Sequence, residues 1–402
     1  MAIQTTANLT PFHIQYKETY EEAARFNRLY DQFATPFPGD MSAMMSGSSV
    51  TYPFLSDMDP GVTAISQTAD VTPQILSDAT ASITPTSRGE ALQWSELLGD
   101  IQQSYNYNER RAERLGVNQA ESVDLLAQAA ALQGTFVYRA AARASLDAGT
   151  TTHRASDALF GRMEGYLQNL HVPAFVTPDG GDQVWMALMH PYPFHDIRES
   201  GNIDAIGIYQ DAGIHLNFEL GKIGPFRLVA NAWAKAFWSA GLANASPVAS
   251  TIAASATANI KLATTIEVNV NTNIAAGQWL LVGTIEAANV FDPQNERVYV
   301  VSVSGTTITI LGQGPNGGLR FTHSVGETVS NADTVYPIVF GGPFSLVKLY
   351  APQIGEFGQL VPEERTGLLK QFINSGWKWY GGYSRLVDNR VLRVEVSSSY
   401  EA

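Results

Sequence analysis

The chain has 402 residues, of which 45% are hydrophobic and 16% charged, a composition that excludes general disorder and suits two or three structural units. The net charge of −13 argues against a protein that binds nucleic acid tightly through its phosphates, although an acidic wall can enclose DNA without adhering to it. There is no cysteine, which excludes disulfides, thiolate metal sites and cysteine nucleophiles.

The amino-terminal residues predict a short amphipathic helix. Thr10 is a suitable N-cap and Pro11 fits the first helical position, and apolar residues recur at four-residue spacing at Phe12, Tyr16, Tyr20 and Ala24. Such a helix packs either on its own domain or on a neighbouring subunit, and the sequence leaves both open.

Residues 35–86 change in character to Pro, Gly, Ser, Thr, Asp and Met, with short strand-like pieces at 49–55 and 74–86. A stretch of this length is uncommon as a plain connection inside a compact domain and usually reaches elsewhere. We interpret it as an extended hairpin or arm.

The strongest helical signal covers residues 105–146. One apolar stripe follows Leu125, Ala129, Leu132, Phe136 and Ala140, and a second follows Val123, Leu126, Ala130, Val137 and Ala141. A continuous helix of this length would span about 60 Å, with Gly116 and Gly134 as the points where we expect it to be interrupted or bent. A second helix is predicted over residues 156–170.

Alternating α and β material follows. Residues 183–189 predict an apolar strand that ends at His190 and Pro191, and residues 194–200 predict a short helix. With the aromatic-rich segment 226–239, this material indicates a compact α+β unit.

From about Ser246 to Thr334 the composition shifts to Ala, Thr, Val, Ile and Asn, with few charges. Strands are predicted over residues 265–271, 278–283, 297–304 and 306–311, with a hairpin at Ser304-Gly305. The segment therefore predicts a small all-β domain with its own core, separable from the domain into which it is inserted. After it we expect strands at 336–340 and 344–350, a loop rich in Pro and Glu, and a final strand pair within 377–399.

The spacing of Gly312, Gly314 and Gly317 matches the glycine-rich fingerprint of dinucleotide sites. The context differs, because Pro315 removes an amide donor and the following residues predict a strand where the motif requires the start of a helix. We interpret these glycines as a β turn.

His190 and His195, with Asp196 beside the second, are the only close histidine pair in the sequence. Pro191 and Pro193 break the helical spacing that zinc ligands use, which favours a strand end with solvated or capping histidines.

Two acidic stretches have structural interpretations. Asp179, Gly180, Gly181 and Asp182 fit a turn, because a calcium site needs more oxygen ligands than they offer. Glu363, Glu364 and Arg365 fit a solvated loop. Since the sequence also lacks a GxSxG, HExxH or P-loop motif, we predict no catalytic, cofactor-binding or metal-binding residues, and no enzyme.

Four features occur in a characteristic order along the chain. They are the arm helix with Tyr20-Glu21-Glu22-Ala23-Ala24-Arg25-Phe26, the hairpin followed by the long helix, the strand ending in His190-Pro191 with Asp196-Ile197-Arg198 after it, and the tail Gly376-Trp377-Lys378-Trp379-Tyr380-Gly381-Gly382 leading into Arg390-Val391-Leu392-Arg393-Val394-Glu395-Val396. In this order they resemble the major capsid proteins of tailed bacteriophages with the Hong Kong ninety-seven type fold, and most of all the coliphage N-four type family. The resemblance covers everything except about residues 246–334.

The resemblance implies an α+β capsid fold with an inserted small all-β domain. Its parts would be an N-terminal arm at 1–46, an extended loop at 47–94, a peripheral domain with a long spine helix at 95–182, a first axial part at 183–245, the inserted β domain at 246–334, and a second axial part with the C-terminal strands at 335–402. The inserted segment departs from the family pattern and is similar to small β-barrel or sandwich modules of phage structural proteins, which implies an outward-facing insertion that decorates or staples a shell, or binds a partner.

The function that the resemblance implies is mechanical. Copies of the chain would form hexamers and pentamers and self-assemble into the icosahedral shell around a double-stranded DNA genome, which they would enclose without sequence-specific binding. The implied partners are the chain itself and portal, scaffolding and decoration proteins, with no cofactor, and the implied location is the virion capsid after assembly in the host cytoplasm. No apolar run approaches the roughly 20 residues of a membrane span and the first residues lack a secretion signal, so we expect no membrane contact.

Two other interpretations stay open. An encapsulin-like protein nanocompartment would share this fold and enclose a protein cargo. A surface carbohydrate-binding protein would act through the β segment.

Overall fold

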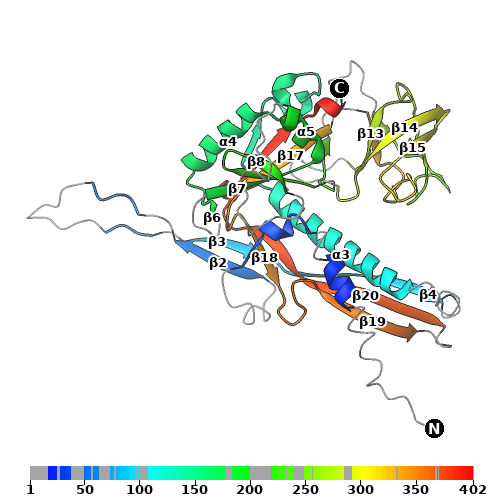
Figure 1. Ribbon diagram of the computed structural model, residues 1–402, viewed down its shortest axis with the longest axis horizontal. Helices are drawn as coiled ribbons and strands as arrows, with labels where there is room; N and C mark the ends of the chain where they lie inside the picture. Colours follow the sequence, from blue (N-terminus) through cyan, green and yellow to red (C-terminus); the bar gives the residue numbers. More distant parts are fainter. Residues whose placement is uncertain are drawn as a thin grey trace, which may run out of the picture. The chain divides into compact units, whose positions relative to one another are not determined.

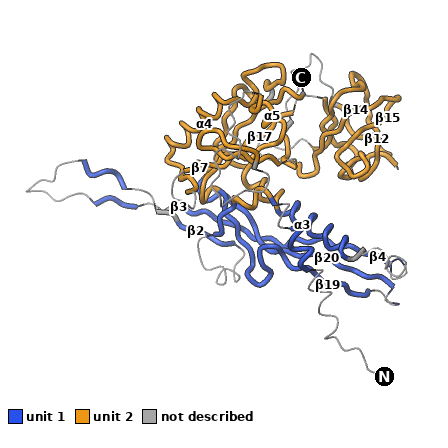
Figure 2. The backbone as a smooth tube through the Cα atoms, viewed as in Figure 1, with its two compact units in different colours: residues 1–28, 34–123, 346–387 blue, residues 29–33, 124–345, 388–402 orange. Residues whose placement is uncertain are grey.

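The computed structural model divides the chain into two compact units (Figure 2). Unit 1 comprises residues 1–28, 34–123 and 346–387, and unit 2 comprises residues 29–33, 124–345 and 388–402. The residues that the structure describes are 17–24, 28–37, 49–55, 58–62, 73–76, 78–95, 98, 107–176, 183–199, 219–231, 233–238, 249–255, 257–284, 292–331, 334–366, 369 and 371–401.

The sheet of unit 1 is organised around one long strand, β20 (Phe372–Arg385). β20 pairs antiparallel with β4 (Thr86–Ser95), β19 (Gln359–Thr366) and β18 (Leu346–Tyr350), and β1 (Thr35–Pro36) pairs parallel with β18. Trp377 and Trp379 of β20 are buried, and the indole of Trp377 donates a hydrogen bond to Asn118 Oδ1 at 2.9 Å.

A separate hairpin precedes β4 in unit 1 (Figure 1). Its strands β2 (Val50–Leu55) and β3 (Asp78–Ile83) pair antiparallel from Val50 opposite Ile83 to Leu55 opposite Asp78. Val50 and Ile83 pack in a small core with Phe37, Val347 and Leu349, which anchors the hairpin base to the sheet. The antiparallel hairpin that the sequence predicted is thus present.

The long helix α3 (Tyr107–Leu132) has 26 residues and is shorter than predicted. At 1.5 Å per residue it spans about 39 Å, and the segment expected to continue it to residue 146 instead forms β5 (Val137–Arg139) and a 3-10 turn, η5 (Arg143–Ser145). The guanidinium of Arg393 donates to the carbonyl of Leu132 and so caps the helix end. Phe136 was predicted to lie in this helix, and that prediction is wrong. It lies after the helix, where it is half-buried and packs against the core of unit 2.

Gly116 does not interrupt the helix. It lies where the arm helix, residues 17–24, crosses α3, and a Cβ at this position would meet the carbonyl oxygen of Tyr20 at 2.5 Å and Cβ of Ala23 at 2.9 Å. Tyr20 and Ala24 are buried, and the Tyr20 hydroxyl donates to the Phe357 carbonyl at 3.1 Å. The sequence left open whether the arm packs on its own domain or on a neighbouring subunit, and Tyr20 and Ala24 pack on their own chain. Thr10, Pro11, Phe12 and Tyr16 lie outside the described residues.

Unit 2 is built on a mixed sheet with two flanking helices, α4 (Asp157–Asn169) and α5 (Pro191–Glu199). The predicted helix at 156–170 and the strand at 183–189 are confirmed, while α5 begins three residues before the predicted 194. The order of the sheet is β5, β21 (Val391–Val396), β17 (Thr334–Gly341), β7 (Gln183–Met189), β9 (Phe226–Ala230) and β8 (Glu219–Ile223), with β6 (Phe175–Val176) on β7 and β10 (Phe237–Trp238) on β17. Phe160, Phe226 and Phe340 form an edge-to-face triad at its centre, with ring centroids 5.0 to 5.6 Å apart.

The inserted segment forms a closed barrel within unit 2. Its strands are all antiparallel and follow the order β11 (Ala249–Thr251), β16 (Thr328–Ser330), β13 (Trp279–Gly283), β14 (Glu296–Ser304), β15 (Thr307–Leu311) and β12 (Thr265–Glu267). The first and last strands are joined by backbone hydrogen bonds from Ala253 to Glu267 at 2.8 Å and from Asn269 to Thr251 at 2.9 Å. An aliphatic core fills the interior, including Leu280, Val298 and Ile308. The four strands predicted here are confirmed, as is the hairpin turn at Gly305, whose φ is +59°.

Two of the implied domain boundaries differ from the observed units. Residues 335–402 do not form one part, because β18, β19 and β20 belong to the sheet of unit 1 whereas β17 and β21 belong to unit 2. The expected strand pair within 377–399 is consequently wrong, since β20 and β21 lie in different sheets. Residues 95–182 are likewise divided, with the change of unit at residue 124 inside α3. None of the described helices is long and apolar enough to cross a membrane.

Two glycine-to-alanine substitutions distinguish the crossing point from an ordinary helical glycine. Gly116→Ala forces its Cβ against the Tyr20 carbonyl and should destabilise the protein by about 1 to 3 kcal/mol. Gly161→Ala, in α4, meets nothing within 4 Å and should stabilise it by about 1 kcal/mol through helix propensity. Thermal denaturation measures both, and an equal shift for the two variants would contradict the close helix crossing.

Candidate functional site

The glycines at 312, 314 and 317 form a turn, as predicted. The amide of Gly312 donates to the Gly317 carbonyl at 2.7 Å, that of Gly314 to the Gly318 carbonyl at 2.8 Å, and that of Gly317 to the Gly314 carbonyl at 2.9 Å. Gly317 has a φ of +75°, the left-handed region that favours glycine. Because these amides bind carbonyls of the same turn, they do not form a phosphate cradle.

His190 and His195 have separate structural environments. Nδ1 of His190 accepts the amide of Tyr192 at 3.2 Å, so His190 caps α5, and its ring stacks on Tyr336 at 4.7 Å. Burial, reinforced by the positive charge of Arg297, lowers the pKa of His190 to about 3. His195 packs against Tyr400, and Asp196 accepts the Ser399 amide at 3.2 Å. The capping interpretation of His190 is confirmed.

The two acidic stretches have different outcomes. Glu363, Glu364 and Arg365 are exposed, but they lie in β19, with Glu364 opposite Asn374, and not in the predicted loop. Asp179, Gly180, Gly181 and Asp182 lie outside the described residues. Among the described residues, no three His, Asp or Glu side chains are grouped as a metal site would require.

A buried ion cluster holds the segment after α3 on the sheet of unit 2. The Glu395 side chain is fully buried, and it accepts bidentate hydrogen bonds from Arg139 at 2.6 and 3.1 Å and from Arg143 at 2.8 and 2.5 Å. Burial alone would raise the pKa of Glu395, but the hydrogen bonds from Arg143 and Arg139 outweigh it and lower the pKa below its usual range. The arrangement is that of a fully paired structural carboxylate.

A second buried carboxylate, Asp124 of α3, fixes the chain that follows the arm helix. Its Oδ1 accepts the backbone amides of Leu29, Tyr30 and Asp31 at 2.9, 2.5 and 3.2 Å, and its Oδ2 accepts the Asn231 amide at 3.2 Å. Burial raises the pKa of Asp124 to about 7 against the opposing effect of the backbone hydrogen bonds. These contacts are likewise structural.

The barrel contacts the rest of unit 2 through polar side chains at the start of β14. Arg297 is buried and donates to the Tyr336 hydroxyl at 2.6 Å, and its guanidinium lies over the rings of Trp279 and Tyr192 at 4.8 and 5.2 Å. The Asn295 side chain donates to the Ala236 carbonyl at 3.0 Å. The barrel is therefore joined to the rest of unit 2 by buried polar contacts as well as by the chain, and its separability stays a prediction.

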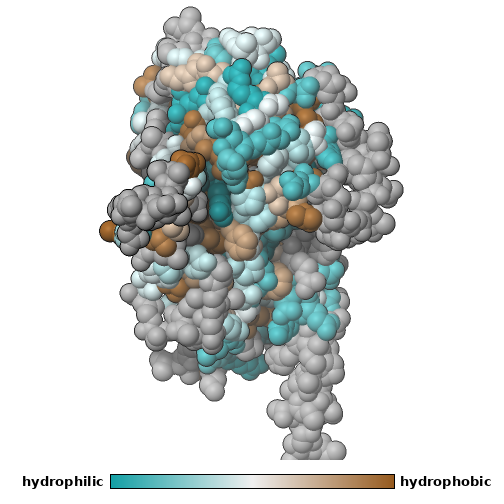
Figure 3. Space-filling view, turned by 90° about the vertical axis from the view of Figure 1, so that its left-hand side faces the viewer, coloured by the Kyte–Doolittle hydropathy of each residue, from teal (hydrophilic) through white to brown (hydrophobic). Residues whose placement is uncertain are grey.

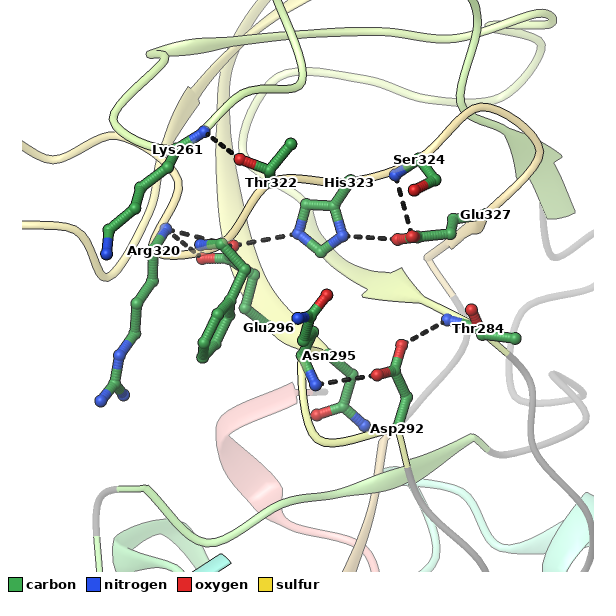
Figure 4. A network of polar contacts seen from close by, with 12 residues as sticks. Lys261, Thr284, Asp292, Asn295, Glu296, Arg320, Thr322, His323, Ser324 and Glu327 are labelled. Atoms are coloured by element: carbon green, nitrogen blue, oxygen red, sulfur yellow. Dashed lines mark hydrogen bonds and ion pairs between the residues drawn. The ribbon is translucent and has the colours of Figure 1, made fainter. Parts of the chain in front are cut away.

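Behind this contact lies a network within the barrel (Figure 4). His323 is held between two carboxylates, with Nδ1 at 2.6 Å from Glu327 and Nε2 at 3.0 Å from Glu296. Glu296 also accepts the backbone amides of Arg320 and Phe321 at 2.9 and 3.0 Å. Burial opposes protonation, but the hydrogen bonds that the ring donates to Glu296 and Glu327 dominate and raise the pKa of His323.

Sequence reasoning missed this network entirely. A signal was present, because Glu296 and Arg297 stand side by side in a segment that carries few charges, directly before an apolar strand. Charged residues at the buried end of a strand are expected to be paired.

The fold is that of tailed-phage capsid proteins. The capsid protein of Ralstonia phage GP4 superimposes on this chain with a TM-score of 0.52 at 12% sequence identity, covering 88% of this chain and 84% of that one. The capsid proteins of Helicobacter pylori bacteriophage KHP30 and Cyanophage P-SCSP1u match with TM-scores of 0.46 and 0.45 at 9% and 11% identity, covering 90% and 87% of this chain and 87% and 83% of theirs. No protein-family model and no curated protein matches the sequence. The chain thus has the Hong Kong ninety-seven type α+β fold, with the barrel as an insertion.

The His323 network gives a pH-dependent stability. A raised pKa means that the stabilisation is present below the usual value of 6.5 and is lost as the pH rises through the folded-state pKa. We expect the free energy of unfolding of the wild type to exceed that of His323→Gln by on the order of 3 kcal/mol near pH 6. The difference should become progressively smaller toward pH 9. Urea denaturation across this range measures the difference, and a difference that is constant with pH would contradict the charged network.

Proposed function

We propose that the protein is a major capsid protein that self-assembles into the icosahedral shell around a double-stranded DNA genome. The observation that carries this proposal is the fold, which is shared with a phage capsid protein over most of both chains. The net charge of −13 supports a wall that does not adhere to the DNA inside it. On this proposal α3 is the spine helix and the hairpin of β2 and β3 is the extended loop.

The far end of the hairpin supports assembly through intermolecular contacts. Residues 58–62 and 73–76 are held together by Gln74, which accepts the Asp59 amide at 2.8 Å and donates to the Asp59 carbonyl at 3.1 Å. Beside this bridge, Met58, Val62 and Ile75 are 64%, 88% and 95% exposed. Apolar side chains gathered on an ordered projection are typical of a surface that is covered by a partner.

Strand β4 offers a second surface of this kind. Nearly all of its residues are exposed, although the strand is 10 residues long, and long unprotected strands invite pairing with another chain. Figure 3 shows a different face of the molecule, on which the coloured hydrophobic residues are scattered among hydrophilic ones. Closed symmetry multiplies such modest contacts, so that no single interface has to be large.

The finer parts of the proposal rest on the sequence motifs. They are the membership of the coliphage N-four type family, the hexamers and pentamers, the portal, scaffolding and decoration partners, assembly in the host cytoplasm, and a purely structural, non-enzymatic role. An encapsulin-like nanocompartment is the alternative within the same fold, and particles that contain a protein cargo instead of DNA would favour it.

Substitution of one hairpin residue tests the assembly role. Ile75→Asp places a charge on a side chain that is 95% exposed in the subunit, so the melting temperature should be unchanged. If a neighbouring subunit covers this side chain, the buried charge should reduce the yield of closed particles at least tenfold, as counted by negative-stain electron microscopy.

The matched control is Val325→Asp, because Val325 is an exposed apolar residue of the barrel at 66%. It should leave particle yield within about twofold of wild type. Equal particle yields from Ile75→Asp and wild type would contradict a role for the hairpin in contacts between subunits.

A further inference from the structure

The two edges of the sheet in unit 1 are built differently. β4 and β19 pair with the same stretch of β20, so they lie on its two opposite sides. The pairing of β19 is interrupted by a register shift between Val361 and Glu364, where Pro362 has no amide hydrogen, and the strand carries three consecutive charged residues at 363–365. Bulges, prolines and charges protect an edge strand against pairing with another chain.

β4 has little of this protection. It pairs with β20 over its whole length, from Thr86 to Ser95, without a register shift, and it contains no proline and no lysine. Its residues are exposed except for Trp94, and none of the described strands pairs with its other edge. A regular strand of this length presents a row of backbone amides and carbonyls with which another strand can pair.

The charged side chains of β4 indicate which strand fits this edge. Arg88 and Glu90 are its only charged residues and both are exposed, and neither forms an ion pair with the part of the chain that the structure describes. They are two positions apart, so their side chains point to the same face of the sheet. A strand with one positive and one negative charge at this spacing is complementary to an antiparallel copy of itself.

The charges also select a register. When two copies of β4 pair antiparallel about a two-fold axis at Gly89, Arg88 of each copy lies directly opposite Glu90 of the other. An axis moved by one residue, to Arg88 or to Glu90, places that residue opposite its own copy and brings like charges together. Opposite charges across a strand pair stabilise it and like charges destabilise it, so the register centred on Gly89 is favoured over both neighbouring registers.

We propose that β4 is the edge at which a second copy of this chain adds to the sheet, antiparallel about Gly89 and through residues 86–92. Ser87 of one copy then lies opposite Ala91 of the other. A two-fold contact of this kind is complete with two chains, so it gives dimers and no longer series. The inference rests on the proposed function for its place in an assembly, but two chains suffice to measure the pairing itself.

Cysteine cross-linking of the full-length protein tests the pairing, because the chain has no cysteine of its own. The double variant Ser87→Cys/Ala91→Cys places thiols opposite each other across the axis, at a Cα separation of about 4.5 to 5.5 Å that a disulfide can bridge. We expect oxidation to give linked dimers on a non-reducing gel and no larger species. Each single variant should stay unlinked, because its thiol lies opposite an alanine or a serine. A ladder of longer species, equal linking in a single variant, or no linking would overturn the proposal.

The same experiment separates this inference from the proposed function. Closed particles of the double variant whose subunits do not link would contradict the pairing of β4 and leave the shell proposal standing. Linked dimers that form no closed particles would support the pairing and contradict the shell proposal.

Charge reversal tests the register. In the double-cysteine background, Arg88→Glu turns both opposite-charge pairs into like-charge pairs and should slow dimer linking at least about tenfold. Adding Glu90→Arg restores the complementarity and should return the rate to within about twofold. The matched control, Lys261→Glu, makes the same change of charge on an exposed side chain of the barrel and should have no effect. Slowing by the control equal to that by Arg88→Glu, or no rescue by Glu90→Arg, would contradict the register centred on Gly89.

Discussion

Glu395 lies in β21, an interior strand of unit 2, and its buried carboxylate accepts hydrogen bonds from both Arg139 and Arg143. Two residues earlier on the same strand, Arg393 caps the end of α3 at Leu132. Leaving a buried charge of this kind unpaired costs about 3 to 5 kcal/mol, so the helix end and the strand after it have one favourable position on the sheet. β17, which returns the chain from the barrel, pairs with this strand, with Pro337 opposite Glu395. The path of unit 2 before the insertion thus depends on one carboxylate, and the strand that carries it also pairs with the strand that follows the insertion.

Local patterns predicted much of the fold. The strands at 183–189 and 297–304 and the helix α4 were expected because burial of one helix face or of a whole strand leaves a recognisable pattern of apolar residues in the sequence. The end of α3 was missed because Arg393, which caps it, is 261 positions further along the chain. The division of residues 335–402 between two sheets was missed because the alternation of apolar and polar residues along a strand is the same whichever sheet the strand joins. The Arg297 and His323 contacts were missed for a related reason, since residues distant in sequence decide which charges are buried.

Polar contacts attach the barrel to the rest of unit 2, whereas an apolar core holds each of these two parts together internally. Its aliphatic core and the core around Phe160 and Phe340 share no residue. The two are joined by directional contacts of Arg297, Asn295 and Lys235, which fix orientation more than they add burial. An insertion joined in this way keeps its own fold while being held in one position. If the protein is a shell subunit, as proposed, this suits a module that the subunit presents, with the apolar hairpin of unit 1 as a separate surface for contact between subunits.

The most direct test of this account is cryo-electron microscopy of the wild-type protein, purified alone and after coexpression with the genes that neighbour its own. The account predicts closed icosahedral particles in which the hairpin between β2 and β3 of each subunit lies against a neighbouring subunit, covering Met58, Val62 and Ile75. A protein that stays monomeric under both conditions, or particles in which these side chains face solvent, would contradict it.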